Sequence, residues 1–237
     1  MRIGLFDSGL GGVNVLSSLI KKFPNNEYIY FGDTKNIPYG NKSKEELLKL
    51  ANDAITFLIS KNVDIIIIAC GTISSNCYQE LKNKYKIPIY DIISPTINYL
   101  KDSNFQNIGI IGTIKTIDSG IFNIKNKNII SKKTPNFVPI IENNEIMNKK
   151  NEIIQELKDL KNIDILVLGC THYPLLKEII ENDLKIKTLD MGECLANTIK
   201  LPNDKNKSYE LYFSKIDEEL LNNINNILHA EFKIYLK

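Results

Sequence analysis

Two cysteines stand at equivalent places in two similar stretches of the chain. Residues 62–70 read NVDIIIIAC and residues 162–170 read NIDILVLGC, so that Cys70 and Cys170 lie 100 residues apart. In both stretches, an apolar run of strand length comes directly before the cysteine. A thiol whose pKa is brought near the working pH can act as a nucleophile, a metal ligand, or an acid and base. The chemistry of the chain is therefore expected at these two positions.

The match between the two stretches favours an internal repeat. Any two buried parallel strands are rich in Val and Ile, but that does not explain Asn, Asp and Cys at matching positions. The pairs Ile3-Gly4 and Ile108-Gly109 correspond in the same way at the start of two earlier apolar runs. We therefore expect two copies of one α/β unit, each with a thiol at the end of a buried strand.

Short apolar runs alternate with longer amphipathic stretches along the chain. Strands are expected at 2–6, 28–31, 63–69, 88–90, 108–111 and 163–168, and helices at 13–22, 44–60, 74–84, 144–161, 175–182, 192–200 and 217–230. This alternation predicts an α/β fold with mainly parallel sheets that are covered by helices on both faces. Together with the repeat, it predicts two pseudo-symmetric α/β lobes with an active-site cleft between them.

The repeat also suggests where the lobes begin and end. The first lobe is expected to span residues 1–93 and to be completed by 207–237, and the second lobe to span 94–206. The chain is expected to cross into the second lobe within 91–100 and to return along the polar stretch 202–207, so that the last helix packs on the first lobe. Open parallel sheets bind ligands beyond the carboxyl ends of their strands, which would place one thiol on each wall of the cleft.

Composition argues against several classes of protein. The net charge is only +2, and Arg2 is the sole arginine, so nothing indicates a nucleic-acid partner. No apolar run reaches membrane-spanning length, and the chain opens on a strand-like segment without a secretory leader, so a cytoplasmic protein is expected. Four cysteines in such a protein are not expected to form disulfides.

The other two cysteines receive a structural interpretation. Cys77 and Cys194 fall on predicted helices and are expected to be small buried hydrophobic residues. A metal site made by Cys70, Cys170 and His172 is an alternative for the thiol pair. The chain has no C-x-x-C pair, and the three ligands would have to converge from two lobes, so no metal is expected.

Four motifs, in chain order, resemble those of the glutamate racemases of the aspartate/glutamate racemase superfamily. They are FDSGLGG at 6–12, YFGDT at 30–34 followed by IPYG at 37–40, ACGTIS at 69–74, and LGCTHYPLL at 168–176. One motif alone would be weak, but four in order over three quarters of the chain are specific. The resemblance implies an isomerase without a cofactor that interconverts L- and D-glutamate and supplies D-glutamate for peptidoglycan.

Racemisation without a cofactor requires two proton-transfer groups, because the proton leaves from one face of the α-carbon and returns to the other. The resemblance implies that Cys70 and Cys170 are these groups, and that Asp7, His172 and Glu142 assist them. The substrate-binding residues that it implies are Asp7, Ser8, Pro38, Tyr39, Gly40, Gly71, Thr72, Thr113, Thr116, Thr171 and His172. It further implies a small acidic amino acid as the partner and a homodimer as a candidate assembly.

Gly71 departs from the family pattern, in which Asn follows the first cysteine. The missing amide would remove one or two hydrogen bonds to the substrate, each worth about 0.5–1.5 kcal/mol. Asn36 likewise replaces an arginine, and the chain is short after Leu201. Three alternatives follow: a pocket weakened for glutamate, a racemase for aspartate or another acidic amino acid, and a binding protein without activity. Placing Asn at position 71 would separate the first of these from the others.

Overall fold

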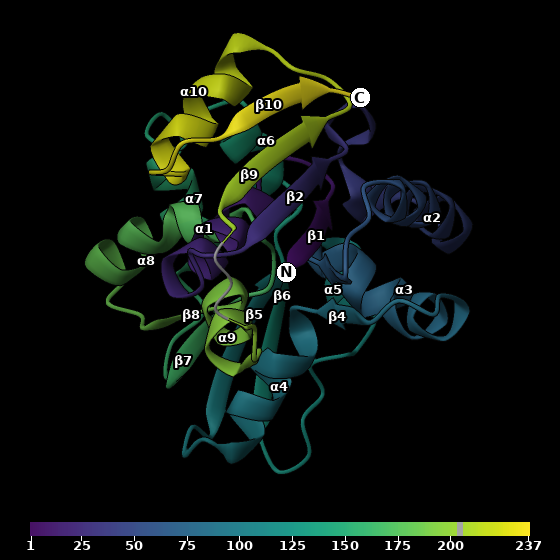
Figure 1. Ribbon diagram of the computed structural model, residues 1–237. Helices are drawn as coiled ribbons and strands as arrows, with labels where there is room; N and C mark the ends of the chain where they lie inside the picture. The colour runs from purple at the N-terminus through teal and green to yellow at the C-terminus, as the bar shows by residue number, and fades with distance from the viewer. Residues whose placement is uncertain (203–205) are drawn as a thin grey trace.

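Two fully parallel sheets form the framework of the protein (Figure 1). The structure is a computed structural model and describes residues 1–202 and 206–237. The first sheet has the strand order β10-β9-β2-β1-β3-β4, and the second has the order β6-β5-β7-β8. The strands are β1 (Arg2–Asp7), β2 (Glu27–Gly32), β3 (Ile65–Ile68), β4 (Ile89–Asp91), β5 (Asn107–Gly112), β6 (Asn128–Lys133), β7 (Ile165–Leu168), β8 (Thr188–Asp190), β9 (Ser208–Phe213) and β10 (Lys233–Leu236).

The helices connect the strands in the alternation that the sequence predicts. The α-helices are α1 (Gly12–Lys22), α2 (Lys44–Ser60), α3 (Gly71–Lys84), α4 (Ile93–Asp102), α5 (Ile114–Asp118), α6 (Phe137–Glu142), α7 (Lys150–Leu157), α8 (Lys177–Asp183), α9 (Met191–Thr198) and α10 (Glu218–Ile227), and the 3₁₀ turns are η1 (Thr34–Asn36), η2 (Tyr39–Asn41) and η3 (Tyr173–Leu176). The predicted α/β fold with two lobes is confirmed. None of the helices in the described part of the chain is long and apolar enough to cross a membrane.

Each sheet buries side chains on both faces, as expected for parallel strands under helices. In β1, Ile3 and Leu5 pack toward α1 and the second lobe, whereas Phe6 packs toward α2. In β5, Ile108 joins the same central core as Ile3, and Ile111 points to the outer core of the second lobe. One apolar core is thus shared between the lobes, with α1, α4 and α9 packed together in it.

The internal repeat is visible in the backbone. Asn62 and Asn162 both adopt left-handed conformations, with φ of 55° and 59°, before β3 and β7. Two residues later, the Asp64 carboxylate accepts the Arg2 N–H at 2.7 Å, and the Asp164 carboxylate accepts the Asn107 N–H at 2.8 Å. Asn tolerates this conformation better than most residues. The Asn and Asp of the repeat therefore set how each cysteine-bearing strand enters its sheet.

Two segments were expected to carry the chain between the lobes. The segment 91–100 holds the end of β4 and most of α4, so the crossing into the second lobe is helical. The last helix, α10, packs on α1, where the Ser17 hydroxyl donates to the Ile227 carbonyl at 3.2 Å. Residues 203–205 of the expected return stretch lie outside the described residues. We use the lobe boundaries 1–93 with 207–237, and 94–206, as a proposed division.

Several predicted elements are wrong in extent or were not predicted. The helix expected at 144–161 is only α7, because Asn144 takes a left-handed conformation with φ of 54° and ends the α6 segment. The helix expected at 175–182 begins as the turn η3, with Pro174 in its first turn. Four strands were not predicted, namely β6, β8, β9 and β10. β6 and β10 are edge strands with mostly exposed side chains, so they lack the apolar pattern of a core strand.

Candidate active site

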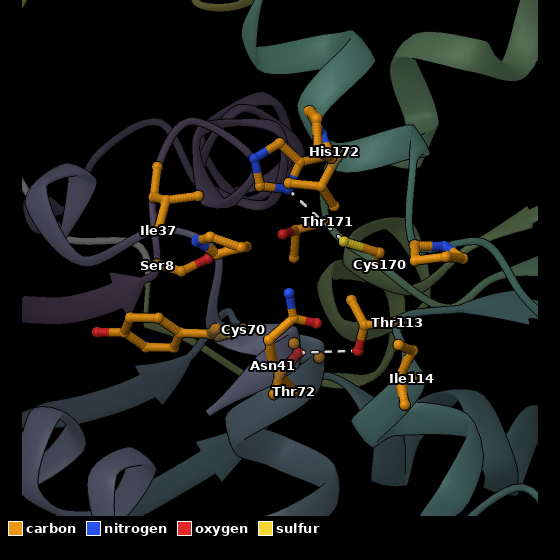
Figure 2. Close-up of a pocket in the computed structure, with 17 residues that line it drawn as sticks. Ser8, Ile37, Asn41, Cys70, Thr72, Thr113, Ile114, Cys170, Thr171 and His172 are labelled. Atoms are coloured by element: carbon orange, nitrogen blue, oxygen red, sulfur yellow. Dashed lines mark hydrogen bonds between the residues drawn. The ribbon is translucent and has the colours of Figure 1, made fainter. Parts of the chain in front are cut away.

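The carboxyl ends of four strands, two from each sheet, surround one small cavity (Figure 2). Ser8 follows β1, Cys70 follows β3, Thr113 follows β5 and Cys170 follows β7. The cavity has a volume of about 70 Å³, which matches a small molecule rather than a polymer. It is lined by Ser8, Ile37, Pro38, Tyr39, Gly40, Asn41, Cys70, Gly71, Thr72, Thr113, Ile114, Pro135, Val138, Pro139, Cys170, Thr171 and His172.

Cys70 forms the wall of the first lobe. It is the N-cap residue of α3 and is 3% exposed. Burial and the neighbouring Asp7 carboxylate raise the pKa of the thiol well above its usual value, although the Ile73 N–H at the start of α3 acts in the opposite direction. Cys70 is therefore a protonated thiol, which can act as a proton donor.

Cys170 forms the opposite wall and has a basic neighbour. Its Sγ lies 3.6 Å from Nδ1 of His172, and Nε2 of the same ring lies 2.5 Å from Oε1 of Glu142. Burial of the ring disfavours its charged form and by itself would lower the pKa of His172. The contacts with Glu142 and with the Cys170 sulfur have a larger opposite effect and hold this pKa well above its usual value. The protonated ring can therefore donate to the Cys170 sulfur through Nδ1 and to Glu142 through Nε2.

Glu142 closes this chain of contacts from the end of α6. Burial alone would raise its pKa, but the charge of His172 and the Leu10 N–H, which donates to Oε1 at 3.3 Å, lower it below its usual value. Glu142 does not line the cavity with the thiols; it lines a neighbouring cavity together with Asp217. Glu142 therefore orients the His172 ring and stabilises its protonated form from outside the cavity of the thiols.

Asp7 lies beneath the cavity and joins the two lobes. Its carboxylate is fully buried and accepts the N–H groups of Gly9 at 3.3 Å and Gly12 at 2.8 Å. The Thr171 hydroxyl donates to it from the second lobe, at 3.5 Å to each oxygen. Burial raises the pKa of Asp7, against the lowering effect of His172 and the backbone donors. Asp7 thus lies next to Cys70 and is tied to the motif of the other thiol.

Three threonine hydroxyls form a second link between the lobes. Thr72 Oγ1 lies 3.1 Å from Thr113 Oγ1, and the Thr113 hydroxyl donates to Thr116 Oγ1 at 3.0 Å. Thr72 and Thr113 line the cavity, and Thr116 stands behind them on α5 and is almost fully buried. Hydroxyls can donate to a carboxylate or accept from an ammonium group, so this wall can bind either end of an amino acid.

The loop from Pro38 to Asn41 covers the cavity from the first lobe. Tyr39 is buried, and its hydroxyl donates to Asp33 Oδ2 at 2.7 Å. A Cβ placed on Gly40 would come within 3.0 Å of the Thr113 Cβ, so Gly40 lets the loop approach the second lobe closely. The loop backbone therefore lies directly against Thr113 of the threonine wall.

Gly71 marks a close approach of the two lobes near the thiols. A Cβ on Gly71 would lie 2.8 Å from the carbonyl oxygen of Gly169, which directly precedes Cys170. A side chain at this position would therefore force the backbone of one of the two cysteine motifs to shift. Glycine at position 71 thus lets the two cysteine motifs lie close together.

Most residues expected from the sequence meet at this one cavity. Eleven of them line it: Ser8, Pro38, Tyr39, Gly40, Cys70, Gly71, Thr72, Thr113, Cys170, Thr171 and His172. Asp7, Thr116 and Glu142 stand behind it and contact lining residues. Cys77 and Cys194 are buried in α3 and α9, away from this lining, as predicted for structural cysteines.

Sequence reasoning did not include six lining residues among the candidate site residues. They are Ile37, Asn41, Ile114, Pro135, Val138 and Pro139. Asn41 directly follows the IPYG motif, and Val138 and Pro139 precede Glu142 by one turn of helix, so proximity to a motif was the available signal. Five of the six are apolar, which is expected in a small-molecule pocket.

The lining of the cavity carries little positive charge. Among the lining residues that the structure describes, His172 is the only basic side chain, and there is no lysine or arginine. Within residues 1–202 and 206–237, no group of three or more His, Cys, Asp or Glu side chains could hold a metal ion. Recognition of a carboxylate in this cavity must therefore use His172, hydroxyls, amides and backbone N–H groups.

Comparison with known proteins gives consistent results. Residues 16–199 match the family model described as Asp/Glu/Hydantoin racemase. Over 234 residues, the chain is 42% identical to the glutamate racemase of Hydrogenobaculum sp. (strain Y04AAS1), covering 92% of this chain and 89% of that protein. It is 38% identical to the glutamate racemase of Aquifex aeolicus (strain VF5), with 98% and 95% of the two chains covered.

The fold is also similar to that of a solved structure with a ligand. The crystal structure of glutamate racemase from Francisella tularensis subsp. tularensis SCHU S4, in complex with D-glutamate, superimposes with a TM-score of 0.86. The two chains are 30% identical, and the match covers 100% of this chain and 96% of the other. The resemblance that the four motifs indicate is confirmed.

Proposed function

The chain belongs to the Asp/Glu/hydantoin racemase family and is an amino-acid racemase that does not depend on pyridoxal phosphate, and from this premise we propose that it interconverts L- and D-glutamate through Cys70 and Cys170. The observation that carries the proposal is that the thiols of the two repeats line one cavity from different lobes. A substrate held between them would present one face of its α-carbon to each sulfur.

The surroundings of the two sulfurs suit opposite starting roles. In this mechanism the Cys170 thiolate, beside protonated His172, removes the α-proton and becomes a thiol. The electron pair stays on the α-carbon and is shared with the α-carboxylate. The Cys70 thiol then gives its proton to the opposite face of the carbon and becomes a thiolate. For the other enantiomer the two sulfurs exchange roles, so a single pair of thiols serves both directions.

Stabilisation of the carbanion is the difficult part of a reaction without an electron sink. Negative charge builds up on the α-carboxylate as the proton leaves, and donors fixed in place before the reaction stabilise it best. The N–H groups at the start of α3 are such donors beside Cys70, and the His172 imidazolium adds its positive charge beside Cys170. Asp7, near Cys70 and bonded to Thr171, fits the amino end of the substrate.

Glutamate is the proposed substrate because the relatives named above carry that activity in their names and cover most of this chain. The D-glutamate in the Francisella structure supports the same choice. D-glutamate made in this way would serve peptidoglycan synthesis. A homodimer and the individual roles of the site residues stay predictions.

The test is racemisation of L-glutamate and L-aspartate in deuterated water, followed by circular dichroism and mass spectrometry. We expect turnover of glutamate with solvent deuterium at the α-position, and losses of about 10²-fold or more in Cys70→Ser and Cys170→Ser, as for removal of an acid or base. Cys77→Ala is the matched control, since that thiol is buried in α3 outside the cavity. Full activity in either serine variant would overturn the two-thiol mechanism, and turnover of aspartate alone would overturn the choice of glutamate.

A further inference from the structure

We propose that Asn41 is a substrate-specificity residue, and that its side-chain amide binds the distal carboxylate of a five-carbon substrate. The proposal rests on the proposed function and deepens it. Asn41 ends the turn η2, lines the cavity and is exposed. Figure 2 shows its amide reaching into the space between the Thr72–Thr113 pair and Thr171.

The Asn41 amide is available for a ligand. None of the hydrogen bonds found within the described residues uses this side chain, although most other polar groups around the cavity are paired with one another. Cys170 is hydrogen-bonded to His172, and Thr72 is hydrogen-bonded to Thr113. Asn41 therefore offers two N–H donors that no other group of the described chain occupies.

The backbone that carries Asn41 is fixed on both sides. Before it, the Tyr39 hydroxyl is held by Asp33, which also accepts the Ser214 hydroxyl at 2.8 Å. After it, Ser43 and Glu46 form a capping box that starts α2. A donor on such a rigid turn loses little conformational entropy when it binds a ligand.

The position of Asn41 decides which part of the substrate it meets. The α-carbon must lie between the two sulfurs, and Asp7, which suits the ammonium group, lies by Cys70. Asn41 lies on the side of the threonine wall, opposite Thr171 and His172 (Figure 2). Since no lysine or arginine is found among the described lining residues, the second carboxylate has to be bound by neutral donors, and Asn41 is the one side-chain amide among them.

With this placement, Asn41 would distinguish diacid substrates by the length of their carbon chain. A five-carbon diacid places its distal carboxylate one methylene further from the sulfurs than a four-carbon diacid does. The bond to Asn41 would form equally in the ground state and the transition state, so its loss raises KM and leaves kcat unchanged. A hydrogen bond to a charged group supports an effect of about tenfold.

The experiment measures binding and turnover separately. Glutarate and succinate, which have no amino group and cannot be racemised, are titrated by calorimetry into the wild-type protein, Asn41→Ala, Asn41→Asp and the control Asn151→Ala, an exposed asparagine on α7. We expect Asn41→Ala to weaken glutarate about tenfold and succinate less than twofold, and Asn41→Asp to weaken glutarate further through like-charge repulsion. In parallel, the KM for L-glutamate should rise about tenfold in Asn41→Ala with kcat within twofold.

The outcomes distinguish this proposal from the proposed function. Unchanged glutarate binding and unchanged KM in Asn41→Ala would overturn the role of Asn41 while racemase activity stands. Failure of the wild-type protein to bind glutarate would overturn it as well. Binding of glutarate that depends on Asn41, in a protein that does not racemise glutamate, would support the role of Asn41 and contradict the proposed function alone.

Discussion

The imidazole of His172 lies between a sulfur and a carboxylate, with its Nε2 2.5 Å from Oε1 of Glu142 and its Nδ1 3.6 Å from Sγ of Cys170. His172 is 1% exposed, so its charge depends on this partner rather than on solvent. A buried imidazole keeps a proton only if a nearby anion compensates for lost hydration. Glu142 thus determines the charge that Cys170 experiences, although it lies outside the cavity of the thiols.

Glu142→Gln should lower the pKa of His172, because the amide keeps the hydrogen bond but removes the negative charge. The chain has only two histidines, so proton NMR can follow both rings over a range of pH. His229, which is exposed after α10, is the internal reference, because the Glu142→Gln substitution should leave its signals as they are in the wild-type protein. With less imidazolium beside Cys170, kcat/KM should fall by about 10- to 100-fold. An unchanged His172 titration would contradict the role given to Glu142.

The same pair should make stability depend on pH. The raised pKa of His172 stabilises the fold below the usual histidine value of 6.5, and this contribution is lost as the pH rises through the folded pKa. The lowered pKa of Glu142 stabilises the fold above the usual glutamate value of 4.5, and this contribution is lost as the pH falls through the folded pKa. The difference in unfolding free energy between wild type and Glu142→Gln should therefore be largest between these two values. Urea unfolding at several pH values measures it, and a difference that does not vary with pH would contradict the ion pair.

Asp7→Asn should make the Cys70 thiol more acidic. Burial is the main cause of its raised pKa and persists in the variant, but the second cause, the Asp7 charge, is removed. Asn can still accept the Gly12 N–H through its carbonyl oxygen. Alkylation of Cys70 by iodoacetamide, followed by mass spectrometry, should begin at lower pH than in the wild-type protein, while that of the buried Cys77 should not change. The same pH profile in both proteins would show that Asp7 does not act on Cys70.

How much of this site could be predicted depended on whether each residue carried a local pattern. The two thiols were predictable because Asn, Asp and Cys recur around buried strands, and the structure explains the recurrence. Asn62 and Asn162 make the left-handed turns, and Asp64 and Asp164 bind the neighbouring strands. Strands β1, β3, β5 and β7, which carry the site, were predictable for the same reason, since their apolar runs are buried on both faces.

Contacts between the lobes could not be predicted in this way. Asn41 has no periodic or spacing signal, and it belongs to the site only because η2 packs against α5 of the other lobe. The edge strands β6 and β10 are mostly exposed and therefore lack the apolar pattern that identifies a core strand. The gap beside Gly71 is also set by the packing of two lobes that are far apart in sequence, and no local pattern reports it.

Gly71→Ala tests whether the narrow gap is real. At an open position near the start of a helix, Ala in place of Gly stabilises a protein by about 0.4–1 kcal/mol through the unfolded state. Here the added Cβ would lie 2.8 Å from the Gly169 carbonyl oxygen, so we expect destabilisation of about 1–3 kcal/mol, as for other overpacked positions. Urea unfolding of the wild type and the variant decides the sign. A stabilised Gly71→Ala protein would mean that the lobes do not approach this closely.

Gly71→Asn extends the test to function. The family pattern predicts that the amide adds hydrogen bonds to the substrate, whereas the geometry predicts that its Cβ holds the two cysteine motifs apart. Because proton transfer requires both sulfurs within reach of one carbon, a wider gap should lower kcat more than it raises KM. We therefore expect Gly71→Ala and Gly71→Asn to lose kcat by similar factors, since they share the same Cβ contact. A gain in kcat/KM for glutamate in Gly71→Asn alone would show instead that the lobes move apart at little cost and that the glycine weakens the pocket.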